Sequence, residues 1–114
     1  MKLEHLQVKN FNFVGLNSQT EGDISFFGKT YFFGTHTGTI TQEDSETISM
    51  HEESEISGNL IASYANVFGK VKGDILAHEK VELFSGSEVR GNIKSKNIQI
   101  HPGATVYGEL ETLV

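Results

Sequence analysis

The feature that most constrains the fold is a recurring triplet of Gly, a polar residue, and Ile or Leu. Its six copies are Gly22-Asp23-Ile24, Gly38-Thr39-Ile40, Gly58-Asn59-Leu60, Gly73-Asp74-Ile75, Gly91-Asn92-Ile93 and Gly108-Glu109-Leu110. The successive glycines are 16, 20, 15, 18 and 17 residues apart. A short repeat of this kind along the whole chain is typical of a solenoid, in which each repeat stacks on the one before it.

Apolar and polar residues alternate around the triplets, which indicates short strands with one buried face. Two segments show the alternation most clearly, with the inward parity occupied by Val71, Gly73, Ile75 and Ala77 in one and by Val89, Gly91, Ile93 and Ser95 in the other. No window sustains the 3.6-residue periodicity of a helix together with helix caps. The sequence therefore predicts an all-β protein.

Equivalent residues at equivalent positions favour stacked coils over a meander of hairpins. Residues 49–58, 82–91 and 99–108 follow one template, and no Asn-Gly or Asp-Gly dipeptide is present to form tight hairpin turns. Each coil would hold three strands and three corners, about 4.8 Å from the next coil. The prediction is a parallel β-helix (β-solenoid) of about six windings with no capping helix. The same alignment places His36 where another coil has the inward Val71.

Length and composition bound the remaining possibilities. The 114 residues suffice for one domain, which we divide into a short tail over residues 1–10 and a β-helix over residues 11–114. Cysteine is absent, which excludes disulfides and thiolate metal sites, and the net charge of −6 argues against sequence-independent nucleic-acid binding. No apolar run approaches the roughly 20 residues of a membrane span, so we expect a cytoplasmic protein.

Acidic residues gather between positions 41 and 60, where no Lys or Arg occurs. They are Glu43, Asp44, Glu46, Glu52, Glu53 and Glu55. One interpretation is a solvated, self-repelling face, and the alternative is an acidic loop that docks a basic partner.

Motifs that could carry chemistry do not have the context they need. Gly28-Lys29-Thr30 resembles the end of a phosphate-binding loop, but the glycine before it leaves five intervening residues instead of four and no helix follows. His51 and His101 share a template position three coils apart, about 14 Å, which is too far for one metal ion. We therefore expect no cofactor and no metal, and a structural protein rather than an enzyme. The alternative, a hexapeptide-repeat transferase or zinc enzyme, requires coils near 18 residues, which these intervals do not keep.

The recurring Gly-x-Ile/Leu and the x-Val-x-Gly before it resemble the bactofilins, polymer-forming cytoskeletal proteins of bacteria. The resemblance is clearest over Val67–Ala77 and covers roughly residues 20–112. It implies a right-handed parallel β-helix, end-to-end polymerisation without nucleotide, and a role in cell shape or as a scaffold at the inner face of the cytoplasmic membrane. It also implies cell-envelope or membrane-associated partners. Residues 1–9 are a faint version of the family's membrane-binding peptide, so direct membrane binding is not among our predictions.

The ends of the solenoid are the predicted sites of self-association. A terminal coil exposes unpaired backbone groups, which monomeric solenoids cover with polar caps, and the sequence shows no candidate cap. The predicted interface residues are Phe11, Phe13, Val14, Leu16, Tyr107, Leu110 and Leu113.

Overall fold

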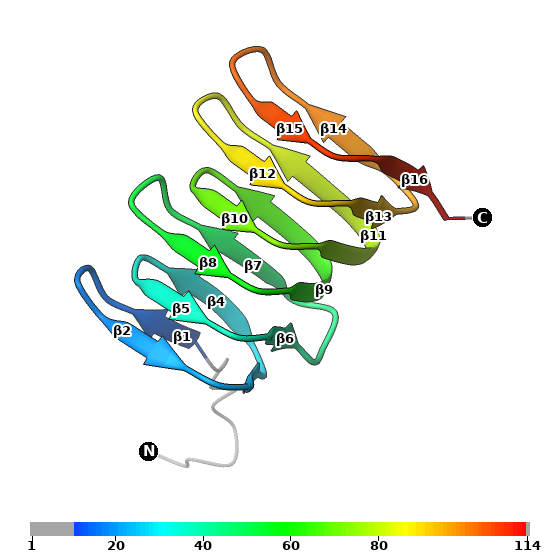
Figure 1. The fold of residues 1–114 in the computed structure, drawn as a ribbon. Coiled ribbons are helices and arrows are strands. Elements are labelled where there is room, and N and C mark those ends of the chain that lie inside the picture. The colour runs from blue at the N-terminus through cyan, green and yellow to red at the C-terminus, as the bar shows by residue number, and fades with distance from the viewer. Residues whose placement is uncertain (1–10, 114) are drawn as a thin grey trace, which may run out of the picture.

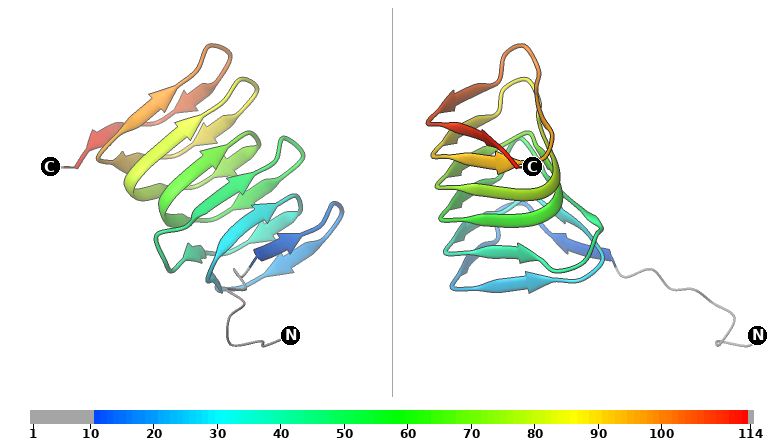
Figure 2. Two further views of the ribbon diagram at one scale, coloured as in Figure 1. Left: turned by 180° about the vertical axis from the view of Figure 1, so that it is seen from behind. Right: turned by 90° about the vertical axis from the view of Figure 1, so that its right-hand side faces the viewer.

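The computed structural model describes residues 11–113, which form a parallel β-solenoid of six windings (Figure 1). The windings comprise residues 11–26, 29–42, 47–62, 64–77, 80–95 and 98–112, and we number them 1 to 6. No helix occurs among the described residues. Every strand pair is parallel, and Figure 2 shows the windings stacked one on another, with β1 and β16 at opposite ends. The predicted fold class and number of windings are confirmed.

Each winding contributes one strand to each of three faces. Face 1 contains β1 (Phe11–Val14), β4 (Lys29–Phe32), β7 (Thr47–Met50), the second half of β9 (Leu60–Val67), the second half of β11 (Ile75–Leu83), and β14 (Ile98–Ile100). Face 2 contains β2 (Gln19–Glu21), β5 (Thr35–Thr37), β8 (Glu55–Ser57), β10 (Lys70–Lys72), β12 (Glu88–Arg90) and β15 (Thr105–Tyr107). Face 3 contains β3 (Ile24–Phe26), β6 (Ile40–Gln42), the first halves of β9 and β11, β13 (Ile93–Ser95), and β16 (Leu110–Thr112).

The connections from face 3 to face 1 differ along the stack. Strands β9 and β11 run on from one face to the next, so they join winding 3 to winding 4 and winding 4 to winding 5 without leaving the sheet. By contrast, winding 2 is joined to winding 3 by residues 43–46, which belong to no strand. This loop accounts for the longest interval between triplet glycines.

The triplet forms the corner between faces 2 and 3. The N–H of its third residue donates to the carbonyl of the polar residue one winding further on, as from Leu60 to Asp74 at 2.9 Å. The polar side chain adds a second ladder, in which Asp74 Oδ1 accepts the N–H of Asn92 at 2.8 Å. A Cβ on Gly73 would overlap the carbonyl oxygen of Gly58, so the backbones approach too closely for any other residue. These contacts explain why both the glycine and the polar residue recur.

The interior of windings 3 to 5 is mainly apolar. Val71 is paired in register with Ile56 on one side and with Val89 on the other, and all three side chains are 0% exposed. Ile75 lies in the same way between Leu60 and Ile93. The inward parity predicted for these segments is confirmed.

The interior of windings 1 and 2 combines apolar side chains such as Phe32 and Ile40 with several buried polar ones. Thr30 Oγ1 donates to Gln42 Oε1 at 2.7 Å, and Asn12 donates from Nδ2 to the carbonyl of Phe27 at 2.7 Å. His36 is 0% exposed, as its alignment with an inward valine indicated, and its Nδ1 shares a hydrogen bond of 2.7 Å with the Thr20 hydroxyl. These side chains take inward positions that apolar residues occupy in windings 3 and 4.

Candidate self-association surfaces

The C-terminal end of the solenoid exposes part of the apolar interior. Within the described residues, winding 6 pairs only with winding 5, so its inward side chains are covered from one side. Ile100 lies in register with Leu83, yet Ile100 is 43% exposed and Leu83 is 0% exposed. Leu110 is 49% exposed over a fully buried Ile93. The free edge of winding 6 therefore combines apolar side chains with strand edges that have no neighbour among residues 11–113.

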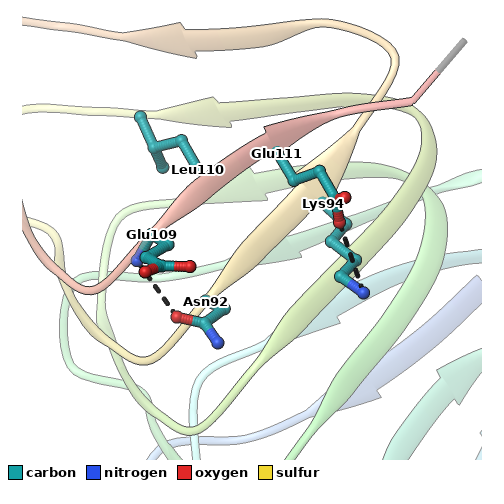
Figure 3. A pocket seen from close by; sticks show the side chains of 5 residues that line it. All are labelled: Asn92, Lys94, Glu109, Leu110 and Glu111. Carbon is teal, nitrogen blue, oxygen red and sulfur yellow. Dashed lines mark hydrogen bonds and ion pairs between the residues drawn. The ribbon is translucent and has the colours of Figure 1, made fainter.

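A shallow hollow of about 430 Å³ lies beside this edge. Figure 3 shows the side chains that line it. Lys94 Nζ and Glu111 Oε2 form an ion pair of 3.3 Å across it, and Asn92 Oδ1 accepts the Glu109 N–H at 3.0 Å. Leu110 lines the same hollow. The polar groups of the hollow thus largely satisfy one another, whereas the leucine side chain is left half exposed.

The N-terminal end is more mixed. Val14 is half-buried and points inward in register with Phe32. Phe11 and Phe13 are 64% and 69% exposed, and they point outward from face 1 in register with Lys29 and Tyr31. Leu16, which is also exposed, lies in the turn after β1.

The seven predicted interface residues therefore lie at the two opposite ends of the stack and point in two directions. Val14 and Leu110 are inward, whereas Tyr107 points outward from face 2, in register with Arg90, whose guanidinium lies 4.4 Å from the centre of the Tyr107 ring. Leu113 follows β16 and donates its N–H to the Ser95 carbonyl at 2.8 Å. Their role as an interface stays a prediction.

The six predicted docking acids do not lie on one loop. Glu43, Asp44 and Glu46 lie between β6 and β7, at the corner of faces 3 and 1. Glu52 and Glu53 lie between β7 and β8, at the corner of faces 1 and 2, so a whole strand separates the two groups. Glu55 belongs to β8 and pairs with Lys72 at 2.8 Å.

Asp44 holds the loop rather than presenting a free carboxylate. It accepts hydrogen bonds from the Gly28 N–H and from Gln42 Nε2, the second at 2.7 Å. Partial burial works against ionisation, and the hydrogen bonds from Gln42 and Gly28 outweigh it, so the pKa of Asp44 is lowered. Gln42 also donates to the Gly28 carbonyl, which ties this corner to the polar interior.

Gly28-Lys29-Thr30, which resembles the end of a phosphate-binding loop in sequence, lies at this hydrogen-bonded corner. Thr30 is 0% exposed with its hydroxyl donated to Gln42, and Lys29 points outward, its Nζ 5.8 Å from the centre of the Tyr31 ring. The two side chains of a phosphate-loop motif thus point to opposite sides of the strand.

Sequence reasoning missed a column of rings along the corner of faces 1 and 2. Phe33 and His51 stack at 4.4 Å, Phe68 and Phe84 at 4.1 Å, and Phe84 and His101 at 4.8 Å between ring centres. Each of these residues directly follows a face 1 strand, and this shared offset was the signal available in the sequence. His101 Nε2 also lies 2.6 Å from Glu82 Oε2, and this hydrogen bond is the main cause of the lowered pKa of Glu82.

Comparison with known proteins decides the family. A family model described as "Bactofilin: Polymer-forming cytoskeletal" matches residues 12–111, which is nearly all of the described solenoid. The chain belongs to the bactofilin family. It is also 28% identical over 98 residues to Bactofilin BacO of Myxococcus xanthus (strain DK1622), covering 86% of this chain and 76% of that protein. A search of solved structures found no match.

The family assignment confirms the resemblance seen in the sequence. It also relates the exposed ends of the solenoid to a family whose members form polymers. Bactofilins are polymer-forming cytoskeletal proteins, a structural class. Among the described residues there is no helix that is long and apolar enough to cross a membrane.

Proposed function

We propose that this chain is a cytoskeletal scaffold that polymerises end to end through its terminal windings, without nucleotide. One observation carries the proposal: inward apolar side chains of winding 6 are partly exposed, whereas the residues beneath them in register are fully buried. Ile100 over Leu83 and Leu110 over Ile93 are the two clearest cases. A further winding laid on this edge would bury them as the interior buries their counterparts.

The physical gain has two parts. Fully burying a Leu or Ile side chain is worth about 1.5–3 kcal/mol, and several such side chains lie on one edge. The strand edges of winding 6 can also pair with a strand from another chain, which is how exposed sheet edges recruit partners. Both parts are supplied by a second copy of the same protein, so no nucleotide is needed to drive the contact.

The cellular role that we propose goes with the family. The polymer would support cell shape or localise partners at the inner face of the cytoplasmic membrane, within the cytoplasm. Its main partner would be itself, together with cell-envelope or membrane-associated proteins. The net charge of −6 sets it apart from proteins that hold nucleic acid by a basic surface.

The test compares two neighbouring substitutions in β14. Ile100→Arg places a charge at the exposed end of the interior, whereas Gln99→Arg places the same charge on the outward side of the same strand. We expect the parent chain and Gln99→Arg to form filaments in nucleotide-free buffer by electron microscopy and sedimentation, and Ile100→Arg to stay in short oligomers. Filaments of equal length from both variants would contradict the proposal, as would a parent chain that stays monomeric at every concentration.

A further inference from the structure

Aromatic side chains gather on the outward side of face 1. Strands β1, β4, β7 and β9 lie side by side there, as Figure 1 shows. Their outward positions and the corner positions that follow them hold six large rings. These are Phe11, Phe13, Tyr31, Phe33, Tyr64 and Phe68, and we call them the aromatic surface. Within residues 11–113, the outward strand positions of face 2 hold one aromatic residue, Tyr107, and those of face 3 hold none. Apolar side chains concentrated on one exposed face are typical of an interaction surface.

A hollow of about 310 Å³ opens within the aromatic surface. Its lining includes Tyr31, Phe33, Ser49, His51, Asn66 and Phe68. Ser49 lies in register between Tyr31 and Asn66, so a small side chain takes the place at the middle of the hollow. An apolar cavity of about 150 Å³ is enough to hold benzene, so this hollow has room for an aliphatic side chain from another segment.

The column of rings at the corner of faces 1 and 2 is interrupted at the same place. His51 and Phe68 occupy equivalent positions, because each directly follows one of two residues that pair in register. Among residues 11–113, however, His51 stacks only on Phe33, and Phe68 stacks only on Phe84. The two rings therefore line the hollow from neighbouring windings without covering each other, which leaves both open to a further side chain.

The chain next to the hollow is acidic. Glu52 and Glu53 directly follow His51, and both are exposed. Neither carboxylate forms an ion pair within residues 11–113. A segment that combines aliphatic side chains with lysine therefore suits both the hollow and the residues beside it.

The stretch that precedes β1 has this combination. Residues 1–10 lie outside the described residues and lead directly into Phe11 on face 1. After the first methionine, their apolar side chains are Leu3, Leu6 and Val8, and their charged side chains are Lys2, Glu4 and Lys9. The two lysines outnumber the single acid, so the charge of this segment is opposite to that of the residues beside the hollow.

We propose that residues 1–10 dock on face 1 of their own chain, with Leu6 in the hollow and Lys2 beside Glu52 and Glu53. The docked segment covers much of the aromatic surface within a single subunit. The inference is independent of the proposed end-to-end assembly, because face 1 runs along the side of the solenoid and not across its ends.

Distances along the stack allow this arrangement. Ser49 lies two windings from Phe13, which is about 10 Å, and Phe13 lies two residues after Phe11, which is about 7 Å. The straight path from Phe11 to the hollow is therefore about 12 Å long. Leu6 precedes Phe11 by five residues, and five extended residues span about 17 Å. The segment thus reaches the hollow, with slack for the turn that directs it back over face 1.

Limited proteolysis of the full chain tests the docking, because trypsin can cleave after Lys9 only when the segment is undocked. Ser49→Trp fills the hollow from the outward side of β7, and Ser57→Trp places the same ring outward on face 2 as the control. By mass spectrometry, we expect Ser49→Trp to lose residues 1–9 on the order of tenfold faster than the parent, since cleavage tracks the undocked population. Ser57→Trp should match the parent. Equal rates in all three proteins would overturn the inference, and so would protection of Lys9 that appears only after phosphatidylglycerol vesicles are added.

A disulfide locates the docked segment, since the chain has no cysteine of its own. Two cysteines form a disulfide only when their Cα atoms lie within about 7 Å of each other. On mild oxidation, the double variant Leu6→Cys with Ser49→Cys should form a disulfide within one chain, and Leu6→Cys with Ser57→Cys should not. Absence of that intrachain disulfide would refute docking at the hollow. Disulfides found only between two chains would show docking on another copy and would refute docking within the subunit.

Discussion

Windings 1 and 2 follow the same path as windings 3 to 5, but the two regions fill their interiors differently. In the central windings Val71 and Ile75 stack on apolar counterparts above and below. In the first two windings Thr30, His36 and Gln42 are buried and linked to side chains of winding 1 or to one another by hydrogen bonds. A buried hydrogen bond contributes about 0.5–1.5 kcal/mol net, and an unpaired buried polar atom costs about 1–3 kcal/mol. The same backbone path thus accommodates either apolar or polar interior side chains, but the polar ones stabilise the folded state less.

The two parts of the interior differ in how specific their contacts are. Apolar stacking stabilises any winding that places aliphatic side chains at the right parity. The polar cluster instead requires particular partners, since Gln42 must reach Thr30, Gly28 and Asp44 together. The first two windings are therefore held in a defined register at the expense of some stability.

The largest effect is expected from a charge in the apolar region. Val71→Asp places an unpaired carboxylate between Ile56 and Val89, at a cost of several kcal/mol against a total stability of roughly 5–15 kcal/mol. We expect the domain to unfold or to melt far below the parent in circular dichroism. Ser57→Asp is the control, because it points outward in register with Lys72 and should melt like the parent. Parent-like melting of Val71→Asp would show that the apolar interior is not what holds the central windings.

A smaller effect of opposite sign is expected from His36. Within residues 11–113 its Nε2 is buried without a hydrogen-bond partner, so an apolar side chain at this position removes an unmet hydrogen bond. The double variant His36→Ile with Thr20→Val makes winding 2 resemble winding 3, where Ile56 occupies the equivalent place. We expect the free energy of unfolding to rise by about 1–2 kcal/mol in urea titrations. A fall in stability would mean that the polar pair contributes more than the aliphatic one.

The smallest effect concerns the pH dependence of the polar region. The folded-state pKa of Asp44 is below its ordinary value of about 3.9, so its stabilisation is present above that pH and is lost as the pH falls through the folded-state pKa. Asp44→Asn should cost about 1 kcal/mol at neutral pH and make the acid dependence of stability shallower. Amide hydrogen exchange should show the change in windings 1 and 2.

A matched variant keeps the Asp44 measurement specific. Glu55, whose pKa is lowered chiefly by a hydrogen bond from Lys72, belongs to winding 3. Glu55→Gln should alter acid stability there and leave exchange at Gly28 and Thr30 unchanged. If both variants speed hydrogen exchange at the same amides, the Asp44 contacts do not act locally.

The sequence was sufficient to predict the features that repeat. The triplet and the alternating parity predicted the windings, the buried face and the unusual place of His36, because each stacked position is filled by the residue one period away. The register of Val89 with Val106 follows directly from the aligned template.

Features that do not repeat could not be predicted. Thr30 lies 18 residues after Asn12 and 12 residues before Gln42. The later windings place apolar residues such as Ile48 and Ala65 in register with Asn12 and Thr30, so no periodic signal linked the three polar residues. Glu46 and Glu52 are close in sequence and were grouped in one acidic segment, interpreted either as a solvated face or as a docking loop. Strand β7 lies between them and places them at different corners. Proximity along a solenoid chain is a poor guide to proximity in space, because each strand carries the chain across a whole face.

The continuous strands β9 and β11 have a mechanical consequence. In a filament under tension, load would pass from winding to winding through the parallel hydrogen bonds and along the chain itself. Windings 3 to 5 are joined by unbroken strand, whereas windings 2 and 3 are joined by residues 43–46, whose slack must be drawn out before the covalent chain shares the load. We expect the subunit to yield first at this joint. The first two windings would peel away as a unit, and the central ribbon would stay stiff.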